Sequence, residues 1–377
     1  MKKKVIRIST VPMSLNLLLK GQLQMLSETY DVVAVSSPGK DLEVVAEREG
    51  VRTVAVPMER HISPLKDLVS LYRLICLFHK EKPWMVHSLT PKAGLLAMLA
   101  GWLCGVPVRI HTFTGLVFPS AVGLKRRLLM ATDRLTCACA TLVNPEGKGV
   151  KRDLAGFGIT KKPLRIIGNG NINGIDLGYF CRTEEVMAKA ESFRKRDGVT
   201  FCFVGRLVGD KGINELVAAF IRLYDENRTS RLLLVGPFED ELDPLLPETK
   251  KQIETQPGIC SVGWQDDIRP YLAVADVFVF PSYREGFPNV VLQAGAMGLP
   301  SIVTDINGCN EIITDKVNGL IVPPKNQVSL YDAMKFMLFH AKERSEMGAR
   351  AASCIARLYD RNVLWKALKE VYAEVME

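Results

Sequence analysis

The chain alternates short apolar runs with longer segments in which apolar residues recur every three or four positions. In the first half the apolar runs are 5–9, 32–36, 51–56, 85–88, 108–112 and 141–143. Helical patterns such as 15–26, 64–79 and 92–104 lie between them. Nearly continuous apolar runs that alternate with helices are typical of a parallel sheet buried on both faces. We therefore predict a parallel sheet with helices on either side of it.

The same alternation starts again after a segment rich in glycine and asparagine, 168–174. Its apolar runs are 199–204, 231–235, 260–262, 277–280, 301–304 and 320–322, and helical patterns occupy 213–224, 268–273 and 289–297. Three amphipathic helices follow at 327–342, 345–358 and 362–376. The fold class is therefore α/β, with Rossmann-like domains at 1–168 and 169–355. A C-terminal helical segment, 356–377, is expected to pack back on the first domain.

Composition excludes several classes of protein. The chain has 377 residues, of which 47% are hydrophobic and 24% charged, as in ordinary globular proteins. The apolar stretch 93–106 is too short and too interrupted for a membrane-spanning helix, so we expect a buried core helix. The basic start lacks the apolar core of a signal peptide, and the nine cysteines form no Cys-x-x-Cys pair. These features predict a cytoplasmic protein with reduced thiols and no structural zinc site.

Charge is unevenly distributed along the chain. Residues 1–168 contain 25 Lys and Arg against 12 Asp and Glu, whereas the remainder contains 24 against 29. A basic half beside an acidic half indicates different partners. An anionic membrane, a phosphorylated substrate or an ordinary solvated surface would each suit the basic half. Nucleic acid is not expected, because zinc-finger, RNP and basic-zipper patterns are absent from the sequence.

One cationic motif follows the apolar run 201–204. Gly205 and Arg206 end the run, and Lys211 and Gly212 precede the next helical pattern. Ligands of open α/β sheets bind at the carboxyl edge of the strands, where these cations would lie. The fork of an arginine and the point charge of a lysine suit a diphosphate, although two solvated loop cations would look the same. A nicotinamide site has little support, since the first strand is not followed by a glycine-rich turn.

A second motif turns the apolar run 277–280 into a helix through the sequence Glu285-Gly-Phe-Pro-Asn289. Gly286 gives the turn conformational freedom, and Pro288 suits a helix start. The amides of Asn289 and Val290 would then face an anion from a helix N-terminus. Glu285, just before them, can accept hydrogen bonds from sugar hydroxyls.

These motifs resemble those of a known family. The segment 281–294 is similar to the donor-site signature of retaining glycosyltransferases of family 4, which have the GT-B fold. The likeness extends to the Arg206–Lys211 motif and to the segments 173–176, 298–304 and 318–324. The segment 109–116 resembles bacterial transferases that build capsule, O-antigen or other lipid-linked glycans. The resemblance implies an acceptor-binding first domain and a donor-binding second domain.

The resemblance also implies roles for individual residues. Arg206, Lys211 and the amides of Asn289 and Val290 would hold the donor diphosphate, and Glu285 and His111 would be catalytic. Contacts with the donor sugar or nucleotide are implied for Gly263, Trp264, Gln265, Asp266, Gly286, Phe287, Pro288 and Gln293, and contacts on the acceptor side for Thr112, Thr114 and Gly115. Gln293 departs from the family, which usually has a second glutamate at this position. A glutamine keeps a hydrogen-bonding oxygen but loses the charge, so ribose binding would change in strength.

The expected reaction moves a sugar, with retention, from a nucleotide-diphosphate sugar to a saccharide hydroxyl. The family resemblance favours a UDP-sugar donor and an acceptor linked to undecaprenyl diphosphate. We expect no metal cofactor, because the Asp-x-Asp pattern of metal-dependent transferases is absent from the sequence. Two alternatives are a non-catalytic protein that binds nucleotide sugars and a sugar-nucleotide epimerase of the same fold.

The location of the protein can also be predicted from a basic cluster. Lys125, Arg126 and Arg127 follow an apolar segment, 116–124, that contains Val117, Phe118, Pro119 and Val122. Apolar side chains that enter a lipid headgroup layer beside cations would hold the protein on an anionic membrane. We therefore expect a peripheral protein on the inner face of the cytoplasmic membrane. The alternative is a solvated basic surface beside a buried helix.

Overall fold

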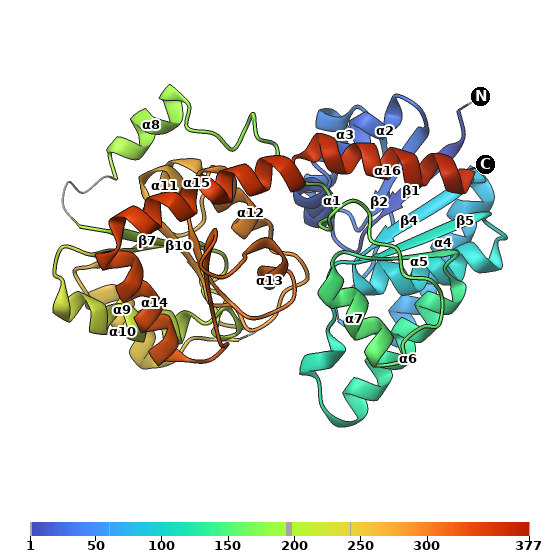
Figure 1. Cartoon of the computed structure of the whole chain (residues 1–377). Helices are drawn as coiled ribbons and strands as arrows, with labels where there is room; N and C mark the ends of the chain where they lie inside the picture. The colour runs from blue at the N-terminus through green and yellow to red at the C-terminus, as the bar shows by residue number, and fades with distance from the viewer. Residues whose placement is uncertain (1, 60, 194–197, 242, 377) are drawn as a thin grey trace. The chain divides into compact units, whose positions relative to one another are not determined.

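The computed structural model describes residues 2–59, 61–193, 198–241 and 243–376, and the chain divides into two compact units (Figure 1). Unit 1 is made of Met1–Gly174 and Asn362–Glu377, and unit 2 of Ile175–Arg361. Unit 1 is therefore built from two segments that lie far apart in the sequence.

Unit 1 contains a six-stranded sheet in the order β3-β2-β1-β4-β5-β6, and all neighbouring strands run parallel. The strands are β1 (Lys4–Ile8), β2 (Asp31–Ser36), β3 (Arg52–Ala55), β4 (Met85–Leu89), β5 (Val108–Phe113) and β6 (Leu142–Pro145). Each lies on one of the six predicted apolar runs. The predicted parallel sheet of the first domain is confirmed.

Helices cover both faces of this sheet and form two separate cores. They are α1 (Pro12–Leu18), α2 (Gln22–Ser27), α3 (Lys40–Glu49), α4 (Pro64–Glu81), α5 (Pro91–Leu103), the short 3-10 helix η1 (Phe118–Ser120), α6 (Gly123–Cys139), α7 (Lys148–Gly156) and α16 (Arg361–Met376). One core joins the sheet to α1, α2, α3 and α16, and the other joins it to α4, α5, α6 and α7. The single helix predicted over 15–26 is wrong, because the chain leaves the helical conformation at Leu19 and Gly21.

The return of the C-terminal helix to the first domain is confirmed. Leu364, Leu368 and Tyr372 of α16 are buried in the same core as Val5 of β1 and Leu15 of α1. In Figure 1 this red helix crosses the strands of unit 1, which are drawn in blue and cyan. Burial of apolar side chains on one side of α16 therefore fastens residues 362–376 to the N-terminal sheet.

Unit 2 repeats the architecture with a sheet in the order β12-β11-β10-β7-β8-β9, again with parallel neighbours. The strands are β7 (Thr200–Val204), β8 (Arg231–Val235), β9 (Ile259–Ser261), β10 (Val277–Phe280), β11 (Ser301–Thr304) and β12 (Gly319–Val322). The helices are α8 (Glu184–Glu191), the 3-10 helix η2 (Gly209–Lys211), α9 (Ile213–Glu226), α10 (Pro247–Thr255), α11 (Arg269–Val274), α12 (Asn289–Ala296), α13 (Cys309–Ile312), α14 (Gln327–Phe339) and α15 (Ala341–Leu358).

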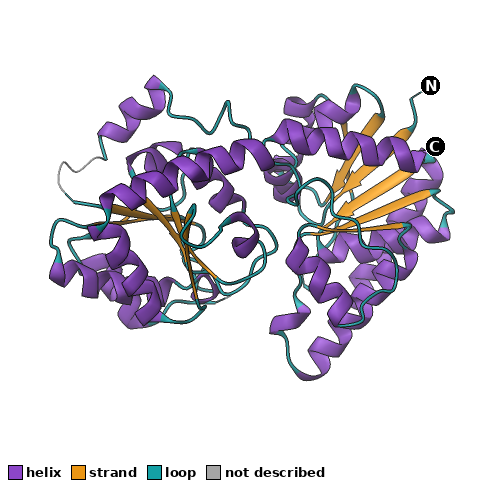
Figure 2. Ribbon diagram, in the orientation of Figure 1, coloured by secondary structure: helices purple, strands orange, loops and turns teal. Residues whose placement is uncertain are grey.

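The sheet of unit 2 is covered by helices on both sides (Figure 2). Phe201, Phe203, Phe278 and Leu233 in its strands are fully buried in one continuous core. Because the strands are parallel, their carboxyl ends meet at one edge of the sheet. The loops after β7, β8, β9 and β10 therefore lie together there, as ligand binding in an open α/β sheet requires.

Candidate active site

The loop after β7 carries the first predicted cation at the carboxyl edge of unit 2. Arg206 Nη1 donates to Glu239 Oε2 at 2.6 Å, and Glu239 comes from the loop after β8. The two side chains keep 40% and 35% of their surface exposed. The guanidinium is thus held at the strand ends by a carboxylate, while part of its surface stays accessible to a ligand. Glu239 lies outside both motifs predicted from the sequence.

Lys211 and Glu285, predicted to bind the diphosphate and the sugar respectively, form an ion pair. Ser282 Oγ donates a hydrogen bond to Glu285 Oε1 at 3.0 Å. Lys211 and Glu285 are only 16% and 18% exposed, so water screens their interaction less than that of a surface pair. The structure brings together two residues that lie 74 positions apart in the sequence. An anionic ligand at Lys211 would compete directly with Glu285.

A second set of polar contacts joins the turn after β10 to the loop after β7. Tyr283 N donates to Asp210 O at 2.8 Å, and Arg284 pairs with Asp210 at 3.0 Å. The Tyr283 hydroxyl donates to Glu215 Oε1 of α9 at 2.6 Å. Burial, and then the hydrogen bond with Glu215, raise the pKa of Tyr283, so its phenol stays neutral. These contacts fix the position of Glu285 relative to Lys211.

The turn continues into α12, which begins at Asn289, with Pro288 as the residue before the helix. Phe287 is 5% exposed, and its ring packs against Tyr359 with centroids 5.6 Å apart. Gly308, in the loop after β11, has φ +74°, and a Cβ there would lie 2.4 Å from Gly286 O. The two loops therefore pack backbone against backbone. Asn289, Val290 and Gln293 of α12 are half-buried.

The loop after β9 carries the residues predicted to lie near the nucleotide base. Gly236 N donates to Gly263 O at 2.9 Å, which ties the loops after β8 and β9 together. Trp264 is 58% exposed, and its Nε1 donates to Asp266 Oδ1 at 3.0 Å. Gln265 Nε2 donates to Val262 O at 2.8 Å. An exposed indole held in one orientation offers a flat apolar face to a ligand.

His111 lies in unit 1, near the carboxyl end of β5, and is 1% exposed. Its Nδ1 is 2.9 Å from Ser88 Oγ, and its ring fills the space where a Cβ of Gly94 would stand. Burial lowers the pKa of His111 to about 3, so the imidazole is neutral at physiological pH. Direct contact with a substrate stays a prediction, and in this structure the ring belongs to the interior of unit 1.

The three residues predicted for the acceptor side are at the end of β5. Thr112 is 1% exposed, and its hydroxyl is 2.7 Å from His87 Nε2. Thr114 and Gly115 follow the strand and are half-buried. Thr112 is therefore an interior residue, whereas the two after it are partly accessible.

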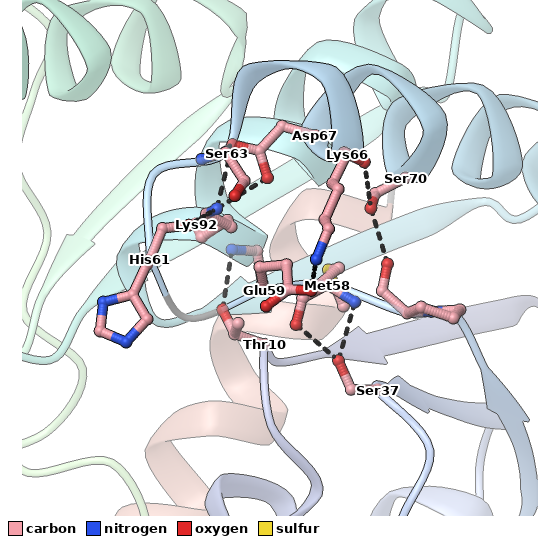
Figure 3. Close-up of polar contacts among 12 residues, drawn as sticks. Thr10, Ser37, Met58, Glu59, His61, Ser63, Lys66, Asp67, Ser70 and Lys92 are labelled. Atoms are coloured by element: carbon pink, nitrogen blue, oxygen red, sulfur yellow. Dashed lines mark hydrogen bonds and ion pairs between the residues drawn. The ribbon is translucent and has the colours of Figure 1, made fainter.

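Polar contacts also fasten the loops at the carboxyl ends of β1 to β4 (Figure 3). Thr10 Oγ1 accepts a hydrogen bond from Ala93 N at 3.1 Å, and Lys92 Nζ pairs with Asp67 at 2.7 Å. Ser37 and Met58 exchange hydrogen bonds of 2.8 Å. The starts of α4 and α5 are thus fixed to the strand ends. These residues lie outside the motifs predicted from the sequence.

The basic cluster lies at the start of α6. Lys125 and Arg127 are exposed, whereas Arg126 is half-buried with its guanidinium 5.2 Å from the centre of the Phe157 ring. Phe118 was expected to reach a lipid layer, and this expectation is wrong. Phe118 is fully buried in the core that joins the sheet to α4, α5, α6 and α7, where its ring also packs edge-on against Phe157 with centroids 5.2 Å apart.

None of the helices in the described part of the chain combines the length and the apolar character needed to cross a membrane.

Two Rossmann-like units, one of which gathers Arg206, Lys211 and Glu285 at its strand ends, define the architecture of a GT-B glycosyltransferase. Family models match both units: residues 22–170 match "Glycosyl transferase 4-like domain" and residues 198–339 match "Glycosyl transferases group 1". The chain belongs to the family 4 type of GT-B glycosyltransferases. The resemblance read from the sequence motifs is confirmed.

Curated relatives are similar over much of their length. The capsular polysaccharide biosynthesis glycosyltransferase CapM of Staphylococcus aureus is 29% identical, and the match covers 98% of this chain and 97% of CapM. The UDP-Gal:alpha-D-GlcNAc-diphosphoundecaprenol alpha-1,3-galactosyltransferase of Escherichia coli is 29% identical over 76% of this chain and 74% of that protein. Among solved structures, Anabaena HepE in complex with UDP and glucose aligns with a TM-score of 0.83 at 15% identity, over 99% of this chain and 100% of HepE. The structural match supports the fold alone.

Proposed function

We propose that this protein transfers a sugar from a UDP-sugar to a hydroxyl of a saccharide linked to undecaprenyl diphosphate, with retention, in the synthesis of a cell-surface polysaccharide. The observation that carries the proposal is the placement of Lys211 and Glu285 in contact, with Arg206 on the same loop. Two cations for a diphosphate and a carboxylate for sugar hydroxyls are the groups that such a donor needs. The name of the Escherichia coli relative supports the donor nucleotide and the acceptor class, and that of CapM supports a role in polysaccharide synthesis.

The proposed step breaks the bond between the anomeric carbon and the diphosphate oxygen. A bond from the acceptor oxygen to the same face of that carbon forms, and the acceptor proton passes to the departing phosphate oxygen. Negative charge grows on the diphosphate as the bond breaks, so Arg206 and Lys211 stabilise the transition state more than the ground state. Glu285 is released from Lys211 when the diphosphate arrives, and its carboxylate then accepts hydrogen bonds from the sugar.

Metal-independent turnover is part of the proposal. Arg206 and Lys211 supply two positive charges at the strand ends, where a divalent cation would otherwise neutralise the diphosphate. We expect full activity in the presence of excess EDTA. Loss of activity on chelation, with recovery on addition of Mg²⁺ or Mn²⁺, would contradict this part.

The central test measures transfer directly. The full chain is incubated with each of several UDP-sugars and a synthetic undecaprenyl-diphosphate saccharide, and the product is analysed by mass spectrometry and by NMR of the new anomeric centre. An α-linked product from an α-configured donor supports the proposal. UDP-sugar binding without UDP release would favour the non-catalytic alternative, and an epimerised sugar without transfer to the acceptor would favour the epimerase alternative.

The proposal includes binding to an anionic membrane through one face of unit 1. Exposed apolar side chains occur on two helices that flank α5, at Leu65, Leu68 and Tyr72 of α4 and at Leu124 of α6, with exposed fractions of 62–81%. Lys125 and Arg127 stand beside Leu124. Apolar and basic side chains together suit a lipid headgroup layer, and a lipid-linked acceptor would be found there.

A further inference from the structure

A continuous series of buried hydrogen bonds links α16 to the end of β5. Arg7 Nη1 of β1 donates to the Tyr372 hydroxyl of α16 at 2.8 Å, and this hydroxyl is 2.7 Å from His87 Nδ1 of β4. His87 Nε2 is 2.7 Å from Thr112 Oγ1 of β5. Asn144 of β6 contacts the same threonine oxygen at 2.9 Å. These five residues, which we call the Tyr372 chain, are between 0% and 5% exposed.

The chemistry of the five groups fixes which partner donates in each hydrogen bond. Arg7 can only donate, so the Tyr372 hydroxyl accepts a hydrogen bond from Arg7 and donates one to His87 Nδ1. Burial, and then the charge of Arg7, hold the pKa of His87 well below its usual range, so His87 is neutral. Its single proton is then on Nε2 and is donated to Thr112 Oγ1.

The hydrogen bond between Thr112 and Asn144 runs in the same direction. The Thr112 hydroxyl donates to the Asn144 side-chain oxygen. This is the amide orientation in which the Asn144 nitrogen donates to Arg165 O at 2.7 Å and to Pro145 O at 3.2 Å. The bonds from Arg7 to Asn144 thus run in one direction, and the Tyr372 hydroxyl is the only contribution of α16 to the Tyr372 chain. Without that hydroxyl, both the arginine and the histidine next to it would lose a partner in a buried site.

The Tyr372 chain ends where the predicted acceptor side begins. Thr112 is the last residue but one of β5, and it pairs in register with Leu89 of β4 and Asn144 of β6. After Phe113, which ends β5, the polypeptide continues into Thr114 and Gly115, which are partly exposed. The strand end is thus linked, through His87, to a side chain from 260 positions later in the sequence.

We propose that Tyr372 is a positioning residue, whose hydroxyl holds the end of β5 and with it the acceptor-side segment 112–115. The kinetic consequence rests on the proposed transferase function, whereas the structural consequence does not. Tyr372 touches no substrate in this proposal and acts through His87 and Thr112.

The test compares Tyr372→Phe with a matched control, Tyr331→Phe. Tyr331 is 2% exposed in α14 of unit 2, and its hydroxyl is bonded to Glu226 and Lys335, so the control also removes a buried hydroxyl but leaves the Tyr372 chain intact. Hydrogen exchange followed by mass spectrometry is measured on the full chain. We expect at least fivefold faster exchange of amides 112–117 in Tyr372→Phe, with amides 364–376 unchanged, and wild-type exchange of 112–117 in Tyr331→Phe. Unchanged exchange of 112–117 would overturn the proposal, and so would equally accelerated exchange of α16, since release of the helix would then be the cause.

Two further measurements keep the outcomes distinct. NMR of ¹⁵N-labelled imidazoles should show His87 as a neutral ring protonated on Nε2 in the wild type, and an Nδ1-protonated ring would overturn the proton order. With a UDP-sugar and a synthetic undecaprenyl-diphosphate saccharide, Tyr372→Phe should raise the KM for the saccharide at least fivefold and change the KM for the UDP-sugar less than twofold. If the wild type transfers no sugar, the proposed function fails, while hydrogen exchange still decides whether Tyr372 holds the strand end.

Discussion

At the scale of single residues, the candidate donor site is a set of charges that already have partners. Lys211 pairs with Glu285 and Arg206 pairs with Glu239, so neither cation is left for water alone to solvate. A diphosphate bound as proposed would therefore replace an existing interaction. The contribution of each cation to turnover would depend on how much more strongly it binds the transition state than it binds its resident carboxylate.

Removal of either cation should affect turnover more than folding. We expect Lys211→Ala and Arg206→Ala each to lower kcat by a factor of 10² to 10³, which corresponds to about 3–4 kcal/mol of transition-state stabilisation. The free energy of unfolding should fall by about 1 kcal/mol in Arg206→Ala, whose ion pair is partly exposed, and by about 2 kcal/mol in Lys211→Ala, whose ion pair is more buried. Steady-state kinetics and urea unfolding measure the two effects.

The control for these two variants is Lys335→Ala. Lys335 of α14 pairs with Glu226 of α9 at 2.7 Å, and Lys335 has no assigned role in the candidate site. The Lys335→Ala variant should retain wild-type turnover. Near-wild-type turnover in either Lys211→Ala or Arg206→Ala would remove that residue from the diphosphate site.

At the scale of elements, the turn into α12 depends on a close approach of two loops. Gly308→Ala would place a methyl group 2.4 Å from Gly286 O at a residue with φ +74°. We expect the free energy of unfolding to fall by about 3–4 kcal/mol, since strain and displacement of backbone add together. UDP-sugar binding should weaken as well, because Gly286 adjoins Glu285. Chemical unfolding and calorimetric titration are the measurements.

Gly298→Ala is the matched control for that change. Gly298 has a similar φ of +80°, but a Cβ there meets nothing within 4 Å. This variant should lose only the cost of the left-handed conformation, about 1 kcal/mol, and keep donor binding. Equal losses in the two variants would show that the contact with Gly286 is unimportant.

Another prediction concerns the end of α4, where one carboxylate joins two strands. Glu81 pairs with Lys4 of β1 at 2.8 Å and with Arg52 of β3, whose Nη1 lies 3.0 Å from Glu81 Oε1. Hydrogen bonds from Arg52 and then from Lys4 lower the pKa of Glu81 from 4.5 to about 2. The ionised carboxylate therefore stabilises the fold above about pH 4.5, and this stabilisation is lost as the pH falls toward 2.

Glu81→Gln should lower the free energy of unfolding by about 1–2 kcal/mol at pH 7, a range that allows for screening at the half-exposed Arg52. The difference between wild type and variant should shrink as the pH is lowered from 4.5 toward 2. Urea unfolding at pH 7, 4 and 3 measures it. A difference independent of pH would mean that packing, and not charge, explains the loss.

The sequence predicted the elements better than the contacts between them. All twelve predicted apolar runs coincide with strands. Most of these strands are buried on both faces, and such a strand is a run of apolar residues that can be seen locally. The break between α1 and α2 was missed, since the apolar pattern continues through it. Phe118 was taken for a surface residue because its partner, Phe157, lies 39 positions away. Glu239 and Tyr372 were missed for the same reason: their role depends on a partner that only the fold brings near.

At the scale of the whole molecule, the uneven charge would make the proposed membrane binding dependent on salt. We expect the full chain to sediment with vesicles that contain anionic phospholipid at low salt and to be released at about 0.5 M salt, because screening weakens each cation's contribution of about 1 kcal/mol. Replacing Lys125, Arg126 and Arg127 together with Glu should abolish sedimentation.

A variant with charge changes elsewhere provides the comparison for that experiment. Replacing Lys250 and Lys251 of α10 in unit 2 with Glu alters the net charge in the same direction, without touching the basic cluster. Vesicle binding should persist in this variant. Vesicle binding that persists after the change at residues 125–127, or that does not depend on salt concentration, would disprove docking through this cluster.

The return of α16 to unit 1 has a consequence for how the protein is made. The partners Arg7 and Tyr372 are 365 residues apart, with all of unit 2 encoded between them. During synthesis the N-terminal sheet leaves the ribosome long before α16, which shares one of its faces with α1, α2 and α3, so part of that face stays open to solvent or to chaperones while about 200 further residues are added. Unit 2 is continuous in the sequence and has every strand it needs once residue 361 has emerged. The second unit can therefore fold to completion before the first, which is finished only when α16 has been translated.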